Sequence, residues 1–359
     1  MTITPRRAAA AALLFACPVL GTHAARADNA TIPNRHAPIG VMGDHLHDKG
    51  EVMVSVRYMR MQMEGMREGT NSLSLTQTQQ QDGFQYVVVP DTMPMDMVMA
   101  GAMYGLTNRI TLMAMGSYIW KSMDHYRDPA GTLPPIPSDT FETQSEGFGD
   151  VKLSALVGLF KTDAASIHLN LGVSLPTGDI EARDVTPAAP NGTILPYPMQ
   201  IGSGTYDFLP GITYNGYQNR WGWGAQLSGI IRTGDNDQNY TLGDEIAATG
   251  WLSYLFTDYA SGSVRLAGRS WGEIDGEGPD RSMIPTAGNP MLDLVPTIRG
   301  ENFGGERLDL SFGLNFAAQN AGARGHRLGL EFGIPVYQDL NGPQMETDWT
   351  VTLGWQKTL

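Results

Sequence analysis

The last eleven residues of the chain, Trp349 to Leu359, alternate in character with a period of two. Successive side chains of a β-strand point to opposite faces, so this segment predicts a strand with one oily and one polar face. A soluble sandwich can contain such a strand. A final strand that ends on an apolar residue is more typical of a barrel closing in a membrane. The two series are Trp349, Val351, Leu353, Trp355, Lys357 and Leu359, and Thr350, Thr352, Gly354, Gln356 and Thr358.

Eleven further segments carry the same alternation. Twelve alternating segments, an even number, predict an all-β fold: a transmembrane antiparallel up-and-down β-barrel of about 12 strands over residues 51–359. Their outward, apolar series span residues 52–58, 98–106, 110–120, 151–159, 167–175, 206–214, 223–231, 246–254, 264–268, 308–316 and 328–336.

Two features favour a membrane barrel over a soluble sandwich. The eleven outward series hold no charged residue, and a Lys or Arg in the middle of a bilayer costs roughly 2–4 kcal/mol. The connections also alternate between short turns and long loops, as in outer-membrane barrels. The long connections are expected near residues 64–94, 122–147, 178–201 and 274–305.

The short connection at Thr107-Asn108-Arg109 gives a register to test. A three-residue turn places Leu106 opposite Ile110, and it pairs Tyr104 with Leu112 and Met103 with Met113. A plain two-residue turn would set an apolar side chain against a polar one, so the three-residue turn is predicted.

The N-terminus predicts a signal peptide over residues 1–27, with Arg6 and Arg7, an apolar stretch, and a cleavage site at Ala25-Arg26-Ala27. Residues 28–50 are then a periplasmic or lumen segment that can plug the barrel. The only cysteine, Cys17, leaves with the signal peptide. The remaining chain has 21 basic and 37 acidic residues, a net charge of −16 against −13 before cleavage. So acidic a chain is a poor partner for nucleic acid.

The inward series of the first three strands is rich in methionine. Three interpretations stay open: flexible packing against an inward-folded segment, a smooth apolar wall for hydrophobic molecules, and a thioether path for Cu(I) or Ag(I). The predicted lumen methionines are Met53, Met59, Met61, Met63, Met95, Met97, Met99, Met103, Met113 and Met115.

The later strands place charge inside instead. Buried Arg and carboxylate side chains in a barrel interior are expected to pair across strands. The lumen therefore has a predicted thioether wall and an opposite charged wall, which holds Arg232, Arg265, Arg269, Arg307, Asp309 and Glu331.

The segment before the first strand is a candidate metal site. His-x-His flanked by aspartates offers imidazole and carboxylate ligands for a divalent ion, although a solvated polar linker fits the loose spacing as well. The candidate ligands are His36, Asp44, His45, His47 and Asp48.

Signatures of catalysis are missing from the sequence. It shows no nucleophile elbow, phosphate loop or zinc signature, and Ser, His and Asp occur at no spacing that singles out a triad. The protein is predicted not to be an enzyme, and it is expected to need no cofactor unless copper or another soft metal binds.

Three stretches resemble a known family: residues 36–45, residues 171–178 (Leu-Gly-Val-Ser-Leu-Pro-Thr-Gly) and residues 197–211. They are similar to the outer-membrane transporters of the phenol meta-cleavage-pathway family. The resemblance implies a porin-like barrel in the outer membrane of a Gram-negative bacterium, distantly similar to barrels that move fatty acids and aromatic hydrocarbons. The final residue is Leu359 rather than the family's usual Phe.

The sequence therefore predicts a passive channel for small, hydrophobic or aromatic solutes. Its expected partners are membrane lipid, lipopolysaccharide, the barrel-assembly machinery and the solute. The alternative function is a Met- and His-rich outer-membrane protein that handles copper.

Overall fold

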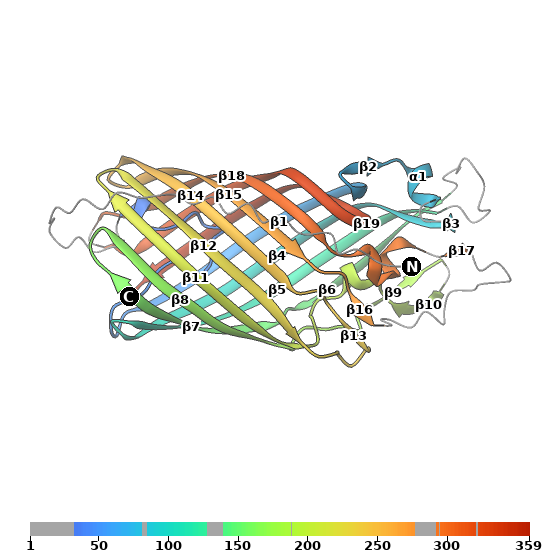
Figure 1. Cartoon of the computed structure of the whole chain (residues 1–359), viewed down its shortest axis with the longest axis horizontal. Helices are drawn as coiled ribbons and strands as arrows, with labels where there is room; N and C mark the ends of the chain where they lie inside the picture. The colour runs from blue at the N-terminus through green and yellow to red at the C-terminus, as the bar shows by residue number, and fades with distance from the viewer. Residues whose placement is uncertain are drawn as a thin grey trace, which may run out of the picture.

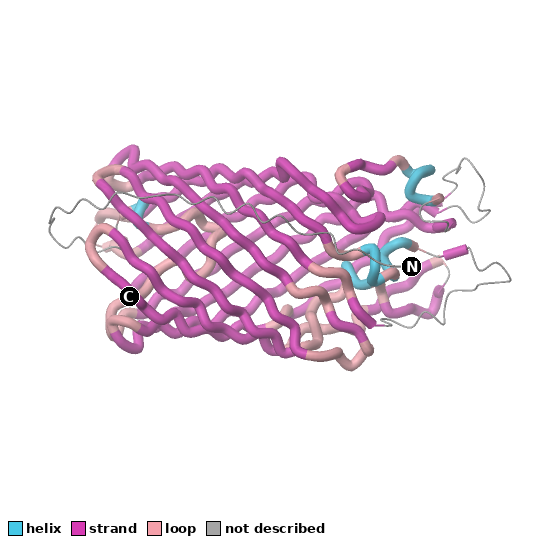
Figure 2. The backbone as a smooth tube through the Cα atoms, in the orientation of Figure 1, coloured by secondary structure: helices cyan, strands magenta, loops and turns pink. Residues whose placement is uncertain are grey.

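The computed structural model describes residues 32–80, 85–127, 139–187, 189–276, 292–293, 295–320 and 322–359. The predicted signal peptide lies outside these residues. Figure 1 shows a closed barrel of tilted strands, and Figure 2 shows that strand makes up most of the tube, with short helical turns near its two ends.

The wall is one antiparallel sheet in which chain neighbours pair in order and the last element returns to the first. Two further strands join it from outside the ring: β2 (Asn71–Leu73) pairs with β1, and β6 (Asp139–Phe148) pairs with β5. The ring elements are β1 (Val52–Gly69), β4 (Val88–Thr107), β5 (Ile110–Arg127), β7 (Val151–Lys161), β8 (Ala165–Leu175), β11 (Tyr206–Gln218), β12 (Trp221–Thr233), β14 (Glu245–Thr257), β15 (Ala260–Trp271), β18 (Gly305–Ala317) and β19 (His326–Thr358).

The last element, β19, crosses the barrel twice. Ten elements precede it in alternating directions, so β1 and β18 run opposite ways. One straight strand cannot be antiparallel to both. Instead residues 327–340 pair with β18, and residues 344–358 pair with β1. The described chain therefore makes twelve crossings, and the predicted twelve-stranded barrel is confirmed.

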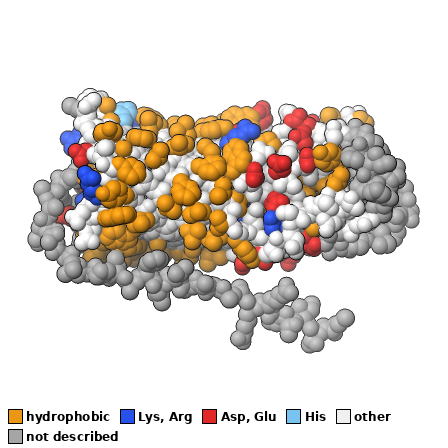
Figure 3. Space-filling view, turned by 90° about the horizontal axis from the view of Figure 1, so that it is seen from above, with side chains coloured by type: hydrophobic (Ala, Val, Ile, Leu, Met, Phe, Trp, Pro, Cys, Tyr) orange, Lys and Arg blue, Asp and Glu red, His pale blue; other side chains and the backbone are white. Residues whose placement is uncertain are grey.

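The outer surface carries the predicted apolar series. Val56, Leu171 and Phe332 are 45%, 43% and 44% exposed, although each sits in the middle of a strand. Figure 3 shows hydrophobic side chains gathered in a belt beside the short-turn end, with Asp and Glu beyond it. A closed sheet leaves no unpaired edge in lipid, so the belt and the closure together place the chain across an outer membrane. Among the described residues, no helix is long and apolar enough to cross a membrane.

The strands extend past this belt at the long-loop end. Arg60 and Asp96 face outward there and form an ion pair of 3.1 Å, with Trp120 opposite Asp96 in register. Much of the stretches predicted as loops at 64–94 and 122–147 is thus strand. Apolar alternation ends where the lipid ends, but backbone pairing needs no lipid and continues.

The first hairpin has the predicted register but a different turn. Tyr104 pairs with Leu112 and Met103 with Met113, as expected. The prediction of a three-residue turn was wrong. Thr107 pairs with Ile110 across a two-residue turn, and a β-bulge before Thr107 restores the register. The Thr107 hydroxyl accepts hydrogen bonds from the backbone N–H groups of Arg109 and Ile110, which stabilises this arrangement.

Loops fold together at the long-loop end. Leu195 and Met199 of the β8–β11 connection are fully buried against Met93 and Met123 of the wall. Tyr197, Tyr240 and Ile274 join three different loops in a second cluster. The small elements of these loops are α1 (Leu75–Gln79), β3 (Gln85–Tyr86), β9 (Arg183–Thr186), β10 (Ala189–Ile194), η4 (Tyr197–Met199), β13 (Tyr240–Thr241), β16 (Asp275–Gly276), β17 (Leu292–Asp293), η6 (Pro296–Ile298) and η7 (Gly300–Asn302).

Candidate functional site

Residues 32–50 lie inside the barrel and are called the plug. They begin and end at the short-turn side: Asn34 Nδ2 donates to the backbone oxygen of Arg220 at 3.1 Å, and the Lys49 amide donates to Asn108 Oδ1 at 2.9 Å. Between these points the plug dips into the lumen, after the helical turn η2 (Pro33–Arg35). A segment without regular structure can be buried only if the wall satisfies its backbone polar groups.

Inward-facing polar side chains of the wall supply those hydrogen bonds. His168 Nε2 lies 2.9 Å from the Gly43 oxygen, and Asn215 Nδ2 donates to the Asp44 oxygen at 2.7 Å. Gln226 Nε2 donates to the Met42 oxygen at 2.9 Å. These three side chains come from β8, β11 and β12. They were not identified from the sequence, although the inward phase of the alternation contains them.

The opposite side of the ring holds the plug by charge and by close packing. Arg327 of β19 donates to the Ala37 oxygen, to Asn315 and to Gln356. Ile39 approaches Gly329 and Gly354 so closely that a Cβ on either glycine would lie under 3 Å from its side chain. The plug therefore contacts both sides of the barrel and occupies its cross-section near the short-turn end.

The methionine wall extends along β1, β4 and β5. Its members face one another across strands: Met53 pairs with Met103 and Met103 with Met113, while Met59 pairs with Met97 and Met61 with Met95. Met63, Met99 and Met115 lie on the same inward phase. The structure thus brings the ten predicted methionines onto one side of the lumen, where they are buried or half-buried.

The two ends of the methionine wall have different neighbours. At the plug end, Met53, Met103 and Met113 pack around Leu46 of the plug. At the outer end, Met63 packs against the cluster made with the β8–β11 connection. That connection is held by Lys121, whose ammonium donates to the backbone oxygens of Pro198 at 2.8 Å and Gln200 at 2.6 Å.

The charged wall consists of ion pairs, most of them between strands. Arg232 of β12 pairs with Asp207 of β11, and Arg265 of β15 pairs with Glu331 of β19. Arg269 lies 3.8 Å from Glu245, and Arg307 lies 3.1 Å from Asp309 on its own strand. Pairing of this kind lowers the cost of keeping charge inside the barrel.

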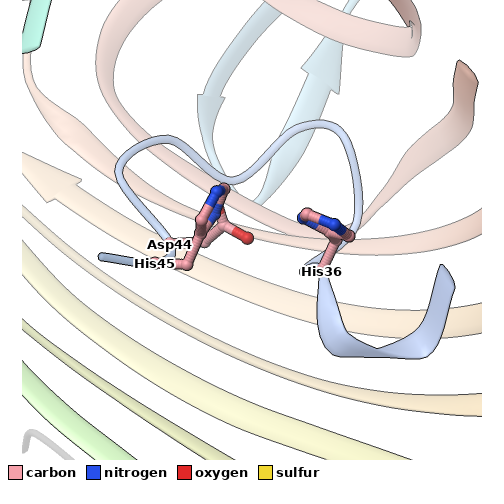
Figure 4. Close-up of side chains that lie close together, drawn as sticks. All are labelled: His36, Asp44 and His45. Carbon is pink, nitrogen blue, oxygen red and sulfur yellow. The ribbon is translucent and has the colours of Figure 1, made fainter. Parts of the chain in front are cut away.

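Three of the five candidate metal ligands meet within the plug. A nitrogen of His36, a nitrogen of His45 and a carboxylate oxygen of Asp44 all lie within 4.8 Å of one another. Figure 4 shows His36 on one arm of the plug and Asp44 with His45 on the other. The other two candidates are engaged elsewhere: His47 Nδ1 lies 3.1 Å from Glu51, and Asp48 pairs with Lys161 at 2.7 Å near the rim.

Burial sets the ionisation of these groups. Loss of water, aided by the positive charge of Arg327, holds the pKa of His36 well below its ordinary value. Burial alone would raise the pKa of Asp44, but the charge and hydrogen bond of His45 hold it well below the usual range. At neutral pH the cluster therefore combines a neutral imidazole at His36 with a carboxylate at Asp44.

Solved structures define the class of fold. The COG4313 outer membrane channel from Pseudomonas putida F1 is similar over 89% of this chain and 100% of its own, with a TM-score of 0.57 and 12% identity. The P. putida toluene transporter TodX is similar over 87% of this chain and 91% of its own, with a TM-score of 0.41 and 10% identity. The likeness to the COG4313 channel, at 12% identity, shows the fold, which is that of an outer-membrane barrel.

The family follows from the sequence of the barrel. The model of the family described as "Putative MetA-pathway of phenol degradation" matches residues 125–332, which is more than half of the 359 residues, and the chain belongs to this family. The predicted family is therefore confirmed. Among curated protein sequences, none matches this chain.

Proposed function

We propose that the protein is an outer-membrane channel, not an enzyme, that passes small hydrophobic or aromatic solutes by passive diffusion along its methionine wall. The observation that carries the proposal is the methionine wall, also called the ladder, across β1, β4 and β5. It extends from the loops at the outer end to the plug at the inner end. The similar barrel from P. putida F1 is an outer membrane channel, which agrees with this role.

The ladder suits apolar solutes for a chemical reason. Thioethers are flexible and polarisable, and each sulfur contact with an aromatic ring is worth about 0.3–1.5 kcal/mol. Many weak contacts of this kind attract an aromatic molecule without trapping it. On the charged wall, the Arg269 and Glu245 side chains are still 34% and 24% exposed, so water occupies that part of the cross-section.

The plug acts as the inner gate in this proposal. Its backbone is held by hydrogen bonds to side chains rather than by strand pairing, so it can be displaced without breaking the barrel. A solute that reaches Leu46 at the inner end of the ladder passes when the plug shifts. Lipid and lipopolysaccharide surround the belt, and the barrel-assembly machinery inserts the chain.

Swelling of liposomes that contain the purified protein tests the proposal. Benzyl alcohol is expected to enter faster than arabinose, which is of similar size but polar. Liposomes with no protein provide the baseline for both solutes. Protein-dependent flux of neither solute, or equal protein-dependent flux of both, would refute a channel selective for apolar molecules.

A further inference from the structure

His36 is buried within the plug without a hydrogen-bond partner at either ring nitrogen. It is 5% exposed, and neither Nδ1 nor Nε2 has a partner among the described residues. A buried polar group without a partner costs about 1–3 kcal/mol. Nothing in the proposed channel function requires that cost, so the orphaned imidazole points to a missing ligand.

Two side chains of the kind that bind metal ions lie close to His36. Its ring meets the ring of His45 edge-on, with 5.0 Å between centroids. Asp44 Oδ1 lies 2.9 Å from His45 Nδ1, and Oδ2 accepts from the Ala37 amide at 2.9 Å. Asp44 thus fixes His45 and the residue next to His36 at the same time. Carboxylates that orient a histidine in this way are a regular part of metal sites, and each Asp44 oxygen still has a lone pair that an ion can use.

The spacing is close to that of a coordinated ion. Ligands about 2.1 Å from a tetrahedral Zn²⁺ lie about 3.4 Å from one another. The three ligand atoms here lie within 4.8 Å, so modest rotation of two side chains brings them into range. Rotation of the His36 ring breaks no hydrogen bond, because neither of its nitrogens has a partner among the described residues.

Ligand type, rather than charge, selects the kind of ion. The positive charges of the buried Arg57 and Arg327 both act on Asp44, so the site offers an ion no net negative charge. Ca²⁺ and Mg²⁺ need several oxygen ligands, which this cluster lacks. Two imidazoles and one carboxylate instead suit Zn²⁺ or Cu²⁺, which bind strongly to nitrogen.

We propose that His36, Asp44 and His45 bind one Zn²⁺ or Cu²⁺ ion and that this ion fastens the two arms of the plug together. An ion that binds only the folded plug stabilises it by mass action. If the plug gates the proposed channel, occupancy holds the gate closed. That regulatory step rests on the proposed function, whereas the binding site does not.

Calorimetric titration of the detergent-solubilised protein, freed of any histidine tag, tests the site with ZnCl2, CuSO4 and CaCl2. One Zn²⁺ or Cu²⁺ per chain and no Ca²⁺ are expected. Changing both His36→Ala and His45→Ala is expected to weaken binding by at least about 10–100-fold, the range found for groups that merely orient a ligand. No Zn²⁺ or Cu²⁺ binding, or equal binding by the double variant, overturns the proposal.

The matched control is His326→Ala. His326 lies outside the plug, where its Nδ1 accepts a hydrogen bond from Trp355 Nε1 at 3.0 Å, and its loss is expected to leave binding unchanged. If the double variant does not fold, the electron paramagnetic resonance spectrum of Cu²⁺ on the unaltered protein decides. Coupling to two imidazole nitrogens supports the site, and a spectrum without nitrogen coupling excludes it.

Flux measurements distinguish ion binding at the site from an effect of the bound ion on the channel. Zn²⁺ or Cu²⁺ is expected to slow benzyl alcohol entry through the unaltered protein and not through the double variant. Binding without any change in an existing flux refutes the regulatory step alone. Absence of flux with and without the ion refutes the channel function and leaves the binding result standing.

Discussion

The two walls of the lumen are lined by side chains of opposite character. The methionine wall of β1, β4 and β5 repeats one soft, uncharged side chain across neighbouring strands. The charged wall of β11 to β19 pairs most of its arginines with a particular carboxylate, such as Arg265 with Glu331. The methionine wall is therefore expected to tolerate other apolar side chains of similar volume, whereas each charge of the charged wall depends on a specific partner.

The largest effect is expected from deletion of the plug, which contacts both sides of the barrel. Deleting residues 36–47 removes the plug from its contacts with Arg327 on one side and the Met53–Met103 cluster on the other. Single-channel recording is expected to change from closed or brief events to a steady open level. An unchanged recording would mean that the plug does not limit passage.

A large loss of stability is expected when one partner of an ion pair is removed from the charged wall. Glu331 and Arg265 side chains are 5% and 16% exposed, so Glu331→Ala leaves a nearly buried guanidinium and is expected to cost about 3–5 kcal/mol. Urea unfolding followed by tryptophan fluorescence measures it. The double change Arg265→Met with Glu331→Leu removes both charges and is expected to cost much less. Equal costs would show that pairing is unimportant there.

A smaller effect is expected at Lys121 of β5, whose ammonium donates hydrogen bonds to backbone oxygens instead of pairing with a carboxylate. Lys121→Met leaves the oxygens of Pro198 and Gln200 without this donor and is expected to cost about 1–3 kcal/mol. The loss is local to the β8–β11 connection, so trypsin is expected to cut faster at the exposed Arg183. Lys161→Met, at the other end of the barrel, is the control. Unchanged cleavage at Arg183 would contradict the role given to Lys121.

The smallest effect is expected within the methionine wall. Met59→Ser with Met97→Ser removes one facing pair of thioethers. Losing sulfur–aromatic contacts of about 0.3–1.5 kcal/mol is expected to slow benzyl alcohol flux roughly two- to tenfold and to leave arabinose flux unchanged. Met59→Leu with Met97→Leu keeps the side-chain volume, and such swaps change stability little. Benzyl alcohol flux through this variant is expected to stay close to that of the unaltered protein. If the double serine variant passes benzyl alcohol as fast as the unaltered protein, the methionine wall does not guide the solute.

The barrel was predictable from the sequence because lipid imposes its own pattern. Val56, Leu171 and Phe332 must alternate with small or polar residues wherever the wall meets acyl chains, and that period of two is visible in the sequence. The strands beyond the belt were not predictable in this way. Around Arg60 and Asp96 the outer face meets water, so the outward apolar series stops while strand pairing continues.

The two walls were predictable as sets of residues but not as partners. The inward phase places Arg265 and Glu331 in the lumen, yet their pairing depends on the stagger of β18, the strand between them. The same holds for the plug. His36 and His45 are visible as potential ligands, but only the return of the plug within the lumen sets His36 beside His45 and sends Asp48 to the rim.

The most direct test of the central claim is a disulfide between the plug and the wall. Cys17, the only native cysteine, lies in the predicted signal peptide, so Ile39→Cys with Gly329→Cys places a single pair where the two backbones are close. Benzyl alcohol flux into liposomes is measured before and after reduction, with each single variant as a control. Slow flux is expected when the disulfide is formed, with recovery when it is reduced. Equal flux in the two states, with the disulfide shown to be present, would contradict the claim that solutes pass only when this plug moves.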